Sequence, residues 1–198
     1  MQIFLCDINK PLIEAWEEAF EDVEDVTVIH GSIFDLKADA LVSPANSFGF
    51  MDGGIDYLIS KNLGWDIQQN LKEYIKTKTV GEILVGQAIA ISTTSDSFPF
   101  VISAPTMRVP MILGADSVNV FLATKAVLYT MKECKLNSVA IPGMGTGVGK
   151  VPVKLCAWQM RKAYDYAKSN YFPSSWTDAQ RSHQLLTVDE SQVRDLQQ

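Results

Sequence analysis

The sequence has few cysteines and no surplus of basic residues, and each absence removes a class of protein. Its three cysteines are an odd number, lie far apart and include no C-x-x-C pair, so neither a disulfide framework nor a zinc site is indicated. The two histidines, His30 and His183, are too distant to suggest another metal site. A formal net charge of -6 argues against bulk binding to nucleic acid, which requires a basic stripe.

Long apolar runs are also missing. Nowhere does the chain approach the roughly 18 apolar residues that a membrane-spanning helix needs, and its start, MQIFLCDINKP, has no signal-peptide pattern. We therefore expect a cytoplasmic protein without a membrane partner. Its 198 residues and 47% hydrophobic content are typical of one globular domain. We predict a single domain over residues 1–189, with a divergent C-terminal extension from about residue 170 and a flexible tail at 190–198.

Short apolar stretches alternate with segments of helical periodicity along most of the chain. This alternation predicts an α/β fold: a three-layer α/β/α sandwich around a central mixed, largely parallel sheet. The predicted strands cover residues 2–6, 26–33, 38–46, 86–92, 98–105 and 137–143, and the predicted helices cover 11–23, 55–63, 66–78, 117–135 and 153–169.

The stretch IPGMGTGVGKVP, residues 141–152, has glycine at four alternate positions between a predicted strand and a predicted helix. It is not a nucleotide-triphosphate P-loop, because Met144 and Val151 stand where that motif needs glycine and Ser or Thr. The even spacing also excludes the dinucleotide fingerprint. Successive glycines and a following helix can instead form a nest of backbone N–H groups for a phosphate, although a glycine-rich turn serving only chain geometry is the alternative.

A second informative stretch is ADALVSPANSFGFMDGGIDYLIS, residues 38–60. A buried strand brings Asn46 to its carboxyl end, and a glycine-containing loop then enters a helix whose first turn holds Asp56. Ligands of open α/β sheets bind outside such strand ends, so the two loops are expected to flank one crevice. Asn46 and Asp56 would then contact a hydroxylated ligand, unless Asp56 serves only to cap its helix.

These two stretches resemble the macrodomain family, the ADP-ribose-binding α/β/α module. VIHGSIFDLKADALVSPANSFGFMDGGID is similar to the family pattern V-x-G-D-I-T-x-x-x-x-D-A-I-V-N-A-A-N followed by G-G-G-V-D. PGMGTGVGKVP is similar to P-x-x-S-T-G-V-[FY]-G-x-P. The resemblance covers approximately residues 25–168 and implies ADP-ribose as ligand or product, with no other cofactor and no metal.

The resemblance also implies roles for individual residues. Asn46 would bind the distal ribose and act with Asp56, which falls at the position of the catalytic aspartate of the hydrolytic branch. The two loops would hold the diphosphate from opposite sides. The full ligand-binding set implied is Ser32, Ile33, Asn46, Gly53, Gly54, Ile55, Gly143, Met144, Gly145, Thr146, Gly147, Val148 and Gly149.

The sequence departs from the family pattern at several positions. The family's adenine-reading aspartate corresponds to Ser32, so Asp7 or Asp35 is a candidate to replace it. Arg108 could clamp a phosphate or, equally, pair with a loop carboxylate. The remaining departures are Ser43 for the first Asn of N-A-A-N, Asp52 for the first glycine of G-G-G, and Gly149 for the aromatic residue of the second loop.

Three functions are compatible with these patterns. The first is an enzyme that hydrolyses a bond at the distal ribose, as an ADP-ribosyl hydrolase or an ADP-ribose-1''-phosphate phosphatase (Appr-1''-p processing) would. The second is a reader module that binds ADP-ribose or an ADP-ribosylated protein without chemistry. The third is a scaffold protein that kept the fold and lost the ligand.

Overall fold

The computed structural model describes residues 1–114 and 116–187, so the tail predicted at 190–198 lies outside the described residues. One six-stranded sheet has the order β2-β1-β6-β3-β5-β4. Every neighbouring pair is parallel except β4 and β5, so the prediction of a mixed, largely parallel sheet is confirmed. The strands are β1 (Gln2–Asp7), β2 (Val26–His30), β3 (Ala40–Ser43), β4 (Ile89–Ser92), β5 (Phe100–Ser103) and β6 (Ser138–Ile141).

Prolines end the two neighbouring central strands at their carboxyl ends. β3 stops immediately before Pro44, and β6 stops immediately before Pro142. Proline has no backbone N–H to donate to a sheet ladder, which explains why both strands stop before their predicted ends at residues 46 and 143. The chain therefore leaves the sheet twice at the carboxyl ends of neighbouring strands, and both glycine-containing loops begin there.

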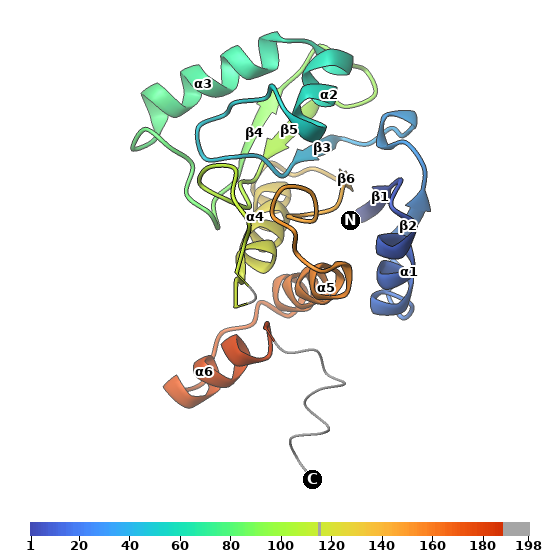
Figure 1. The fold of residues 1–198 in the computed structure, drawn as a ribbon, viewed down its shortest axis with the longest axis vertical. Helices are drawn as coiled ribbons and strands as arrows, with labels where there is room; N and C mark the ends of the chain where they lie inside the picture. The colour runs from blue at the N-terminus through green and yellow to red at the C-terminus, as the bar shows by residue number, and fades with distance from the viewer. Residues whose placement is uncertain (115, 188–198) are drawn as a thin grey trace.

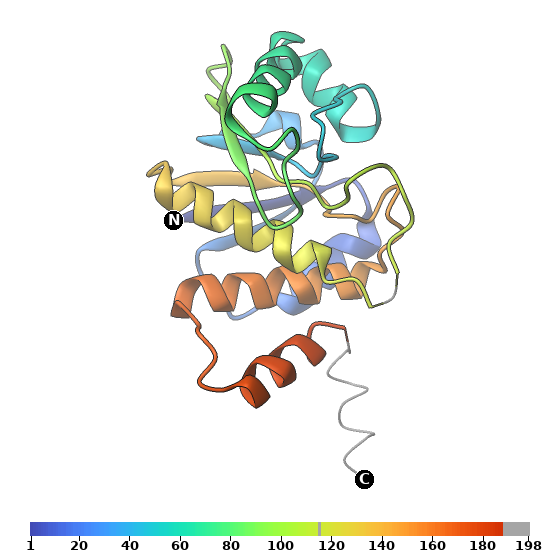
Figure 2. The same ribbon diagram turned by 90° about the vertical axis from the view of Figure 1, so that its left-hand side faces the viewer.

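Helices cover both faces of the sheet, and Figures 1 and 2 show the resulting three layers. One hydrophobic cluster packs α1, α4 and α5 on one face, and a second packs α2 and α3 on the other. Side chains of β3 alternate between them, with Val42 in the first and Leu41 in the second. The helices are α1 (Lys10–Ala19), α2 (Gly54–Leu63), α3 (Asp66–Lys78), α4 (Asn119–Glu133), α5 (Val153–Ser169) and α6 (Trp176–Gln184), with a 3-10 turn η1 (Ile33–Asp35).

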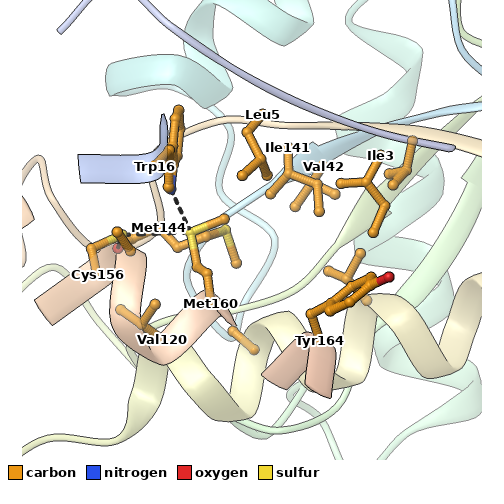
Figure 3. Close-up of a cluster of buried hydrophobic side chains, with 14 of the residues drawn as sticks. Ile3, Leu5, Trp16, Val42, Val120, Ile141, Met144, Cys156, Met160 and Tyr164 are labelled. Atoms are coloured by element: carbon orange, nitrogen blue, oxygen red, sulfur yellow. Dashed lines mark hydrogen bonds between the residues drawn. The ribbon is translucent and has the colours of Figure 1, made fainter. Parts of the chain in front are cut away.

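A sulfur-rich part of the core lies under the start of the second glycine loop (Figure 3). The indole Nε1 of Trp16 donates to Sδ of Met160 at 3.3 Å, and the Cys156 thiol donates to the carbonyl oxygen of Met144 at 3.3 Å. All four residues are buried. Burial raises the pKa of the Cys156 thiol to about 12, so it is an unreactive packing group that anchors Met144.

The C-terminal extension packs against the domain near residues 185–186, whereas α6 buries none of its side chains. Nε1 of Trp158 on α5 donates to the carbonyl oxygen of Leu185 at 2.7 Å, and the side chain of Leu186 is buried against Phe121 and Ala163. The first strand, β1, occupies an interior place between β2 and β6, and no strand follows α5 in the part of the chain described. None of the helices within the described residues is long and apolar enough to cross a membrane.

Candidate functional site

A cavity of about 440 Å³ opens where β3 and β6 end. Its walls come from the carboxyl end of β1 and from segments 44–56, 106–110 and 142–149. This is the position at which open α/β sheets bind their ligands, because the loops that leave parallel strands gather there. Among the described lining residues there is neither lysine nor arginine, while Asp7, Asp52 and Asp56 are acidic. An anion in this cavity must therefore be held by backbone amides and neutral side-chain donors.

The loop after β6 exposes such amides. The carbonyl oxygens of Gly145 and Gly147 accept the N–H groups of Val151 and Lys150, which folds the loop back on itself. Gly145 has φ +71°, a left-handed conformation that favours glycine. The N–H groups of residues 146–148, by contrast, donate to no acceptor in the described part of the chain. Three successive unpaired donors beside a cavity are the arrangement that an anion-binding nest requires.

Asp7 holds the first residue of this loop in place. Its Oδ2 accepts the N–H of Gly143 at 3.1 Å, and its Oδ1 accepts the N–H of Asn9 at 2.9 Å. The carboxylate at the end of β1 thus ties the first residue of the glycine loop to the start of α1. Each oxygen keeps a second lone pair, so the side chain, which lines the cavity, can still accept a bond from a ligand.

The loop between β3 and α2 is shaped by Asn46. Its Oδ1 accepts the N–H groups of Phe48 and Phe50 at 3.1 and 3.3 Å, and its Nδ2 donates to the carbonyl oxygen of Phe50 at 2.8 Å. Nδ2 carries a second hydrogen that remains for a ligand. The amide therefore holds the loop and lines the cavity at the same time.

The start of α2 supplies a second set of donors. Gly53 is the N-cap residue and has no side chain to satisfy the first turn. The N–H groups of residues 54–56 consequently donate to no acceptor within the described residues. The positive end of the helix dipole lies at the same place, which favours a negatively charged ligand group. The two loops thus present unpaired donors from two walls of one cavity.

Asp56, in this first turn, is buried, with a relative exposure of 8%. Ser43, the last residue of β3, is fully buried and its hydroxyl donates to Oδ1 of Asp56 at 2.6 Å. Burial, opposed by that hydrogen bond and reinforced by the charge of Asp52, raises the pKa of Asp56 from 3.8 to about 6. A carboxylate with this pKa is largely ionised at neutral pH and is basic enough to accept a proton from water.

The macro domain family model matches residues 42–160 of the chain. That match begins within β3 and spans both glycine-containing loops and the cavity walls between them. The chain belongs to the macro domain family. The resemblance seen in the sequence motifs is therefore confirmed, and so is the predicted α/β/α architecture.

Relatives and solved structures of this family differ in how much they resemble the chain. An uncharacterized protein of Aquifex aeolicus is 40% identical over 137 residues, which are 69% of this chain and 78% of that protein. An Oceanobacillus iheyensis macrodomain solved with ADP has a TM-score of 0.61 at 19% identity, over 84% of this chain and 88% of that one. A Trypanosoma brucei macrodomain in complex with ADP-ribose has a TM-score of 0.53 at 20% identity, over 68% and 55%. These structures share the fold.

Most residues implied by the macrodomain resemblance line the one cavity. Met144 does not, because its side chain is buried in the core beneath the loop. Ser32 caps η1 by accepting the N–H of Phe34, and Ile33 packs under α2 and α3, so neither reaches the described cavity wall. The predicted residues that the structure brings together there are Asn46, Gly53, Gly54, Ile55, Asp56, Gly143, Gly145, Thr146, Gly147, Val148 and Gly149.

The structure separates the remaining candidates. Asp7 lines the cavity, whereas Asp35 ends η1 outside it. Arg108 is not part of the wall: its Nε donates to Oε2 of Glu82 at 2.8 Å, and its guanidinium lies over the ring of Phe48. Of the two sequence interpretations of Arg108, the structure therefore gives the structural partner of a loop carboxylate.

The second loop has no room for a side chain at Gly149. An added Cβ would come within 2.5 Å of the carbonyl oxygen of Gly145, which belongs to the backbone and cannot move aside cheaply. The family's aromatic residue at this position is therefore incompatible with the loop conformation of this chain. Gly149 is itself buried, and an added Cβ would also meet Met107 and Leu113 at 3.1 and 3.2 Å, whereas Val148 beside it is exposed.

Sequence reasoning missed part of the wall. The segment after β5 contributes Thr106, Met107 and Pro110, and its position could not be read from spacing because it carries no glycine pattern. The isolated parallel bridge between Asn46 and Met107 brings it against the first loop. Asn9 and Phe50 also line the cavity. In the described chain no three His, Cys, Asp or Glu side chains are placed to hold a metal ion.

Proposed function

We propose that this protein binds ADP-ribose and hydrolyses a bond at its distal ribose. The observation that carries the proposal is the pair of unpaired N–H sets, at residues 146–148 and 54–56, on two walls of one cavity without basic side chains. A diphosphate bridging them would be held by charge-assisted hydrogen bonds, each worth about 1.5–3 kcal/mol. Macrodomain structures solved with ADP and with ADP-ribose support this choice of ligand.

In this proposal the catalytic groups lie at the distal-ribose end. Asn46 donates through Nδ2 to a ribose hydroxyl, and Asp56 orients a water molecule toward C1''. As the water oxygen bonds to C1'', Asp56 accepts a proton, and the bond from C1'' to the oxygen of the linked group breaks. The departing group then takes up a proton, which returns Asp56 to its starting state. Positioning of ligand and water accounts for most of the rate in such a site.

The linked group defines the enzyme class. Release of a protein side chain would make the protein an ADP-ribosyl hydrolase. Release of phosphate from ADP-ribose-1''-phosphate would make it a phosphatase of the Appr-1''-p processing type.

A non-catalytic ADP-ribose reader is the second candidate. It is favoured by Ser43 and Gly149, which replace the asparagine and the aromatic residue of the family pattern. The third candidate, a scaffold without ligand, is disfavoured by a cavity of about 440 Å³ lined by unpaired donors, since a site released from ligand binding has no physical reason to keep them.

Two measurements separate these functions. Calorimetry and thermal shift with ADP-ribose, with AMP and ribose 5-phosphate as part-ligands, test binding; no heat and no shift at millimolar ADP-ribose would select the scaffold. Hydrolysis of an ADP-ribosylated peptide and of ADP-ribose-1''-phosphate is then compared for wild type and Asp56→Ala. Turnover by wild type alone supports the enzyme. Binding by both proteins with no turnover by either would select the reader.

A further inference from the structure

The carboxylate of Asp56 is held by one neutral donor from the sheet. Ser43 Oγ lies 2.6 Å from Oδ1, within the range of a hydroxyl donating to a carboxylate. Both side chains are buried, so water does not compete for this bond. Oδ1 is thereby occupied, while Oδ2 has no hydrogen-bond partner among the described residues. The two oxygens of one carboxylate consequently have different surroundings.

The groups around Asp56 do not otherwise fix its orientation. No lysine or arginine lines the described cavity, so no cation pairs with the carboxylate. Asp52, in the loop before α2, is the charged neighbour that acts on Asp56, and it repels it. From β3 the neighbour is Ser43 itself. The hydroxyl therefore has no substitute if it is removed.

We propose that Ser43 is a positioning residue of this site: its hydroxyl holds Oδ1 of Asp56, so that Oδ2 is the oxygen directed to the ligand and its water. This inference rests on the proposed function, because the water is the one that attacks the distal ribose. The replacement of asparagine by serine at this position of the family pattern then keeps a donor for the aspartate.

The neighbouring strand provides a matched control. Ser103 is the register partner of Ser43 across the β3–β5 pair. It is also fully buried, but its Oγ has no hydrogen-bond partner. Ser43→Ala and Ser103→Ala remove the same hydroxyl from paired positions of the same two strands. They differ in whether a bond to Asp56 is lost.

The test is the pKa of Asp56, which is measured in wild type and in both variants by carbon-13 NMR titration of the aspartate carboxyl groups. A hydrogen bond to a charged group stabilises the ionised form, so Ser43→Ala is expected to raise that pKa by about 1–2 pH units. Ser103→Ala is expected to leave it unchanged. An unchanged pKa in Ser43→Ala, or the same rise in both variants, would overturn the positioning role.

Asp52→Asn provides a test in the opposite direction. Removing a repelling charge is expected to lower the pKa of Asp56, and because Asp52 is exposed this effect should shrink as salt rises toward about 1 M. The effect of Ser43→Ala comes from a buried contact and should persist at high salt. A salt-sensitive effect of Ser43→Ala would contradict the proposal.

Kinetics separates this inference from the proposed function. In Ser43→Ala the acidic limb of the pH profile of kcat should move upward with the measured pKa, kcat at pH 7.5 should fall about tenfold or more, and KM should change little. A limb that stays in place while the pKa moves would overturn the positioning role. Absence of turnover in wild type would refute the proposed function, and the NMR comparison would still decide whether Ser43 holds Asp56.

Discussion

Replacement of Asp56 by asparagine should stabilise the protein while abolishing turnover. The carboxylate lies in a buried position without a cation, and its pKa rises from 3.8 to about 6. At 1.36 kcal/mol per pKa unit this rise corresponds to about 3 kcal/mol of destabilisation of the folded state at neutral pH. Asparagine has nearly the same shape, and its carbonyl oxygen can still accept the Ser43 hydroxyl. We expect a gain of about 1–3 kcal/mol at pH 7.5, since the new amide hydrogens also need partners.

The sign of the pH dependence follows from the same pKa. Between about pH 4 and pH 6 the folded protein binds a proton at Asp56 more tightly than the unfolded chain does, so this group stabilises the fold as the pH falls. The advantage of Asp56→Asn should therefore be complete above about pH 7 and small at pH 4, where Asp56 is protonated in the folded state and half-protonated in the unfolded one.

Urea unfolding of wild type and Asp56→Asn at pH 7.5 and pH 4 measures this difference. For a chain of this size, 1–3 kcal/mol corresponds to a rise in Tm of about 3–10 °C. Asp52→Asn is the control, because Asp52 is an exposed carboxylate and its removal should change stability by less than about 0.5 kcal/mol. A less stable Asp56→Asn at pH 7.5, or a gain of the same size at pH 4, would refute the argument.

Three further substitutions test the site. Gly147 lines the cavity, and an added Cβ meets open space there. Gly147→Val should therefore weaken ADP-ribose binding at least tenfold in calorimetry without lowering Tm. Gly31→Ala, at an equally open position away from the cavity, should change neither the affinity nor Tm. Arg108→Ala should leave affinity within about twofold and cost less than about 1 kcal/mol, and a large loss of affinity would restore the clamp interpretation. Gly149→Ala should weaken binding and lower Tm together, because its Cβ displaces the backbone of Gly145.

Much of the fold could be predicted because its signals are local. Helical periodicity and short apolar runs mark the elements, although the strands predicted at 38–46 and 137–143 extend past Pro44 and Pro142, where the two strands end. The glycines at residues 143–149 indicate a loop of exposed amides for the same reason, since the backbone freedom of glycine is a property of the residue itself. The position of β1 between β2 and β6 is different, because strand order depends on contacts between distant segments.

The sequence by itself determined the family, most of the succession of elements and two of the loops that line the cavity, because each depends on residues close together in the chain. Tertiary structure decided the chemistry of individual side chains. It buried Asp56 against Ser43, placed Asp7 rather than Ser32 or Asp35 at the cavity wall, and paired Arg108 with Glu82. Burial and charge partners come from residues 13 to 136 positions apart, as the Ser43–Asp56 and Asp7–Gly143 contacts show, and no local pattern encodes them.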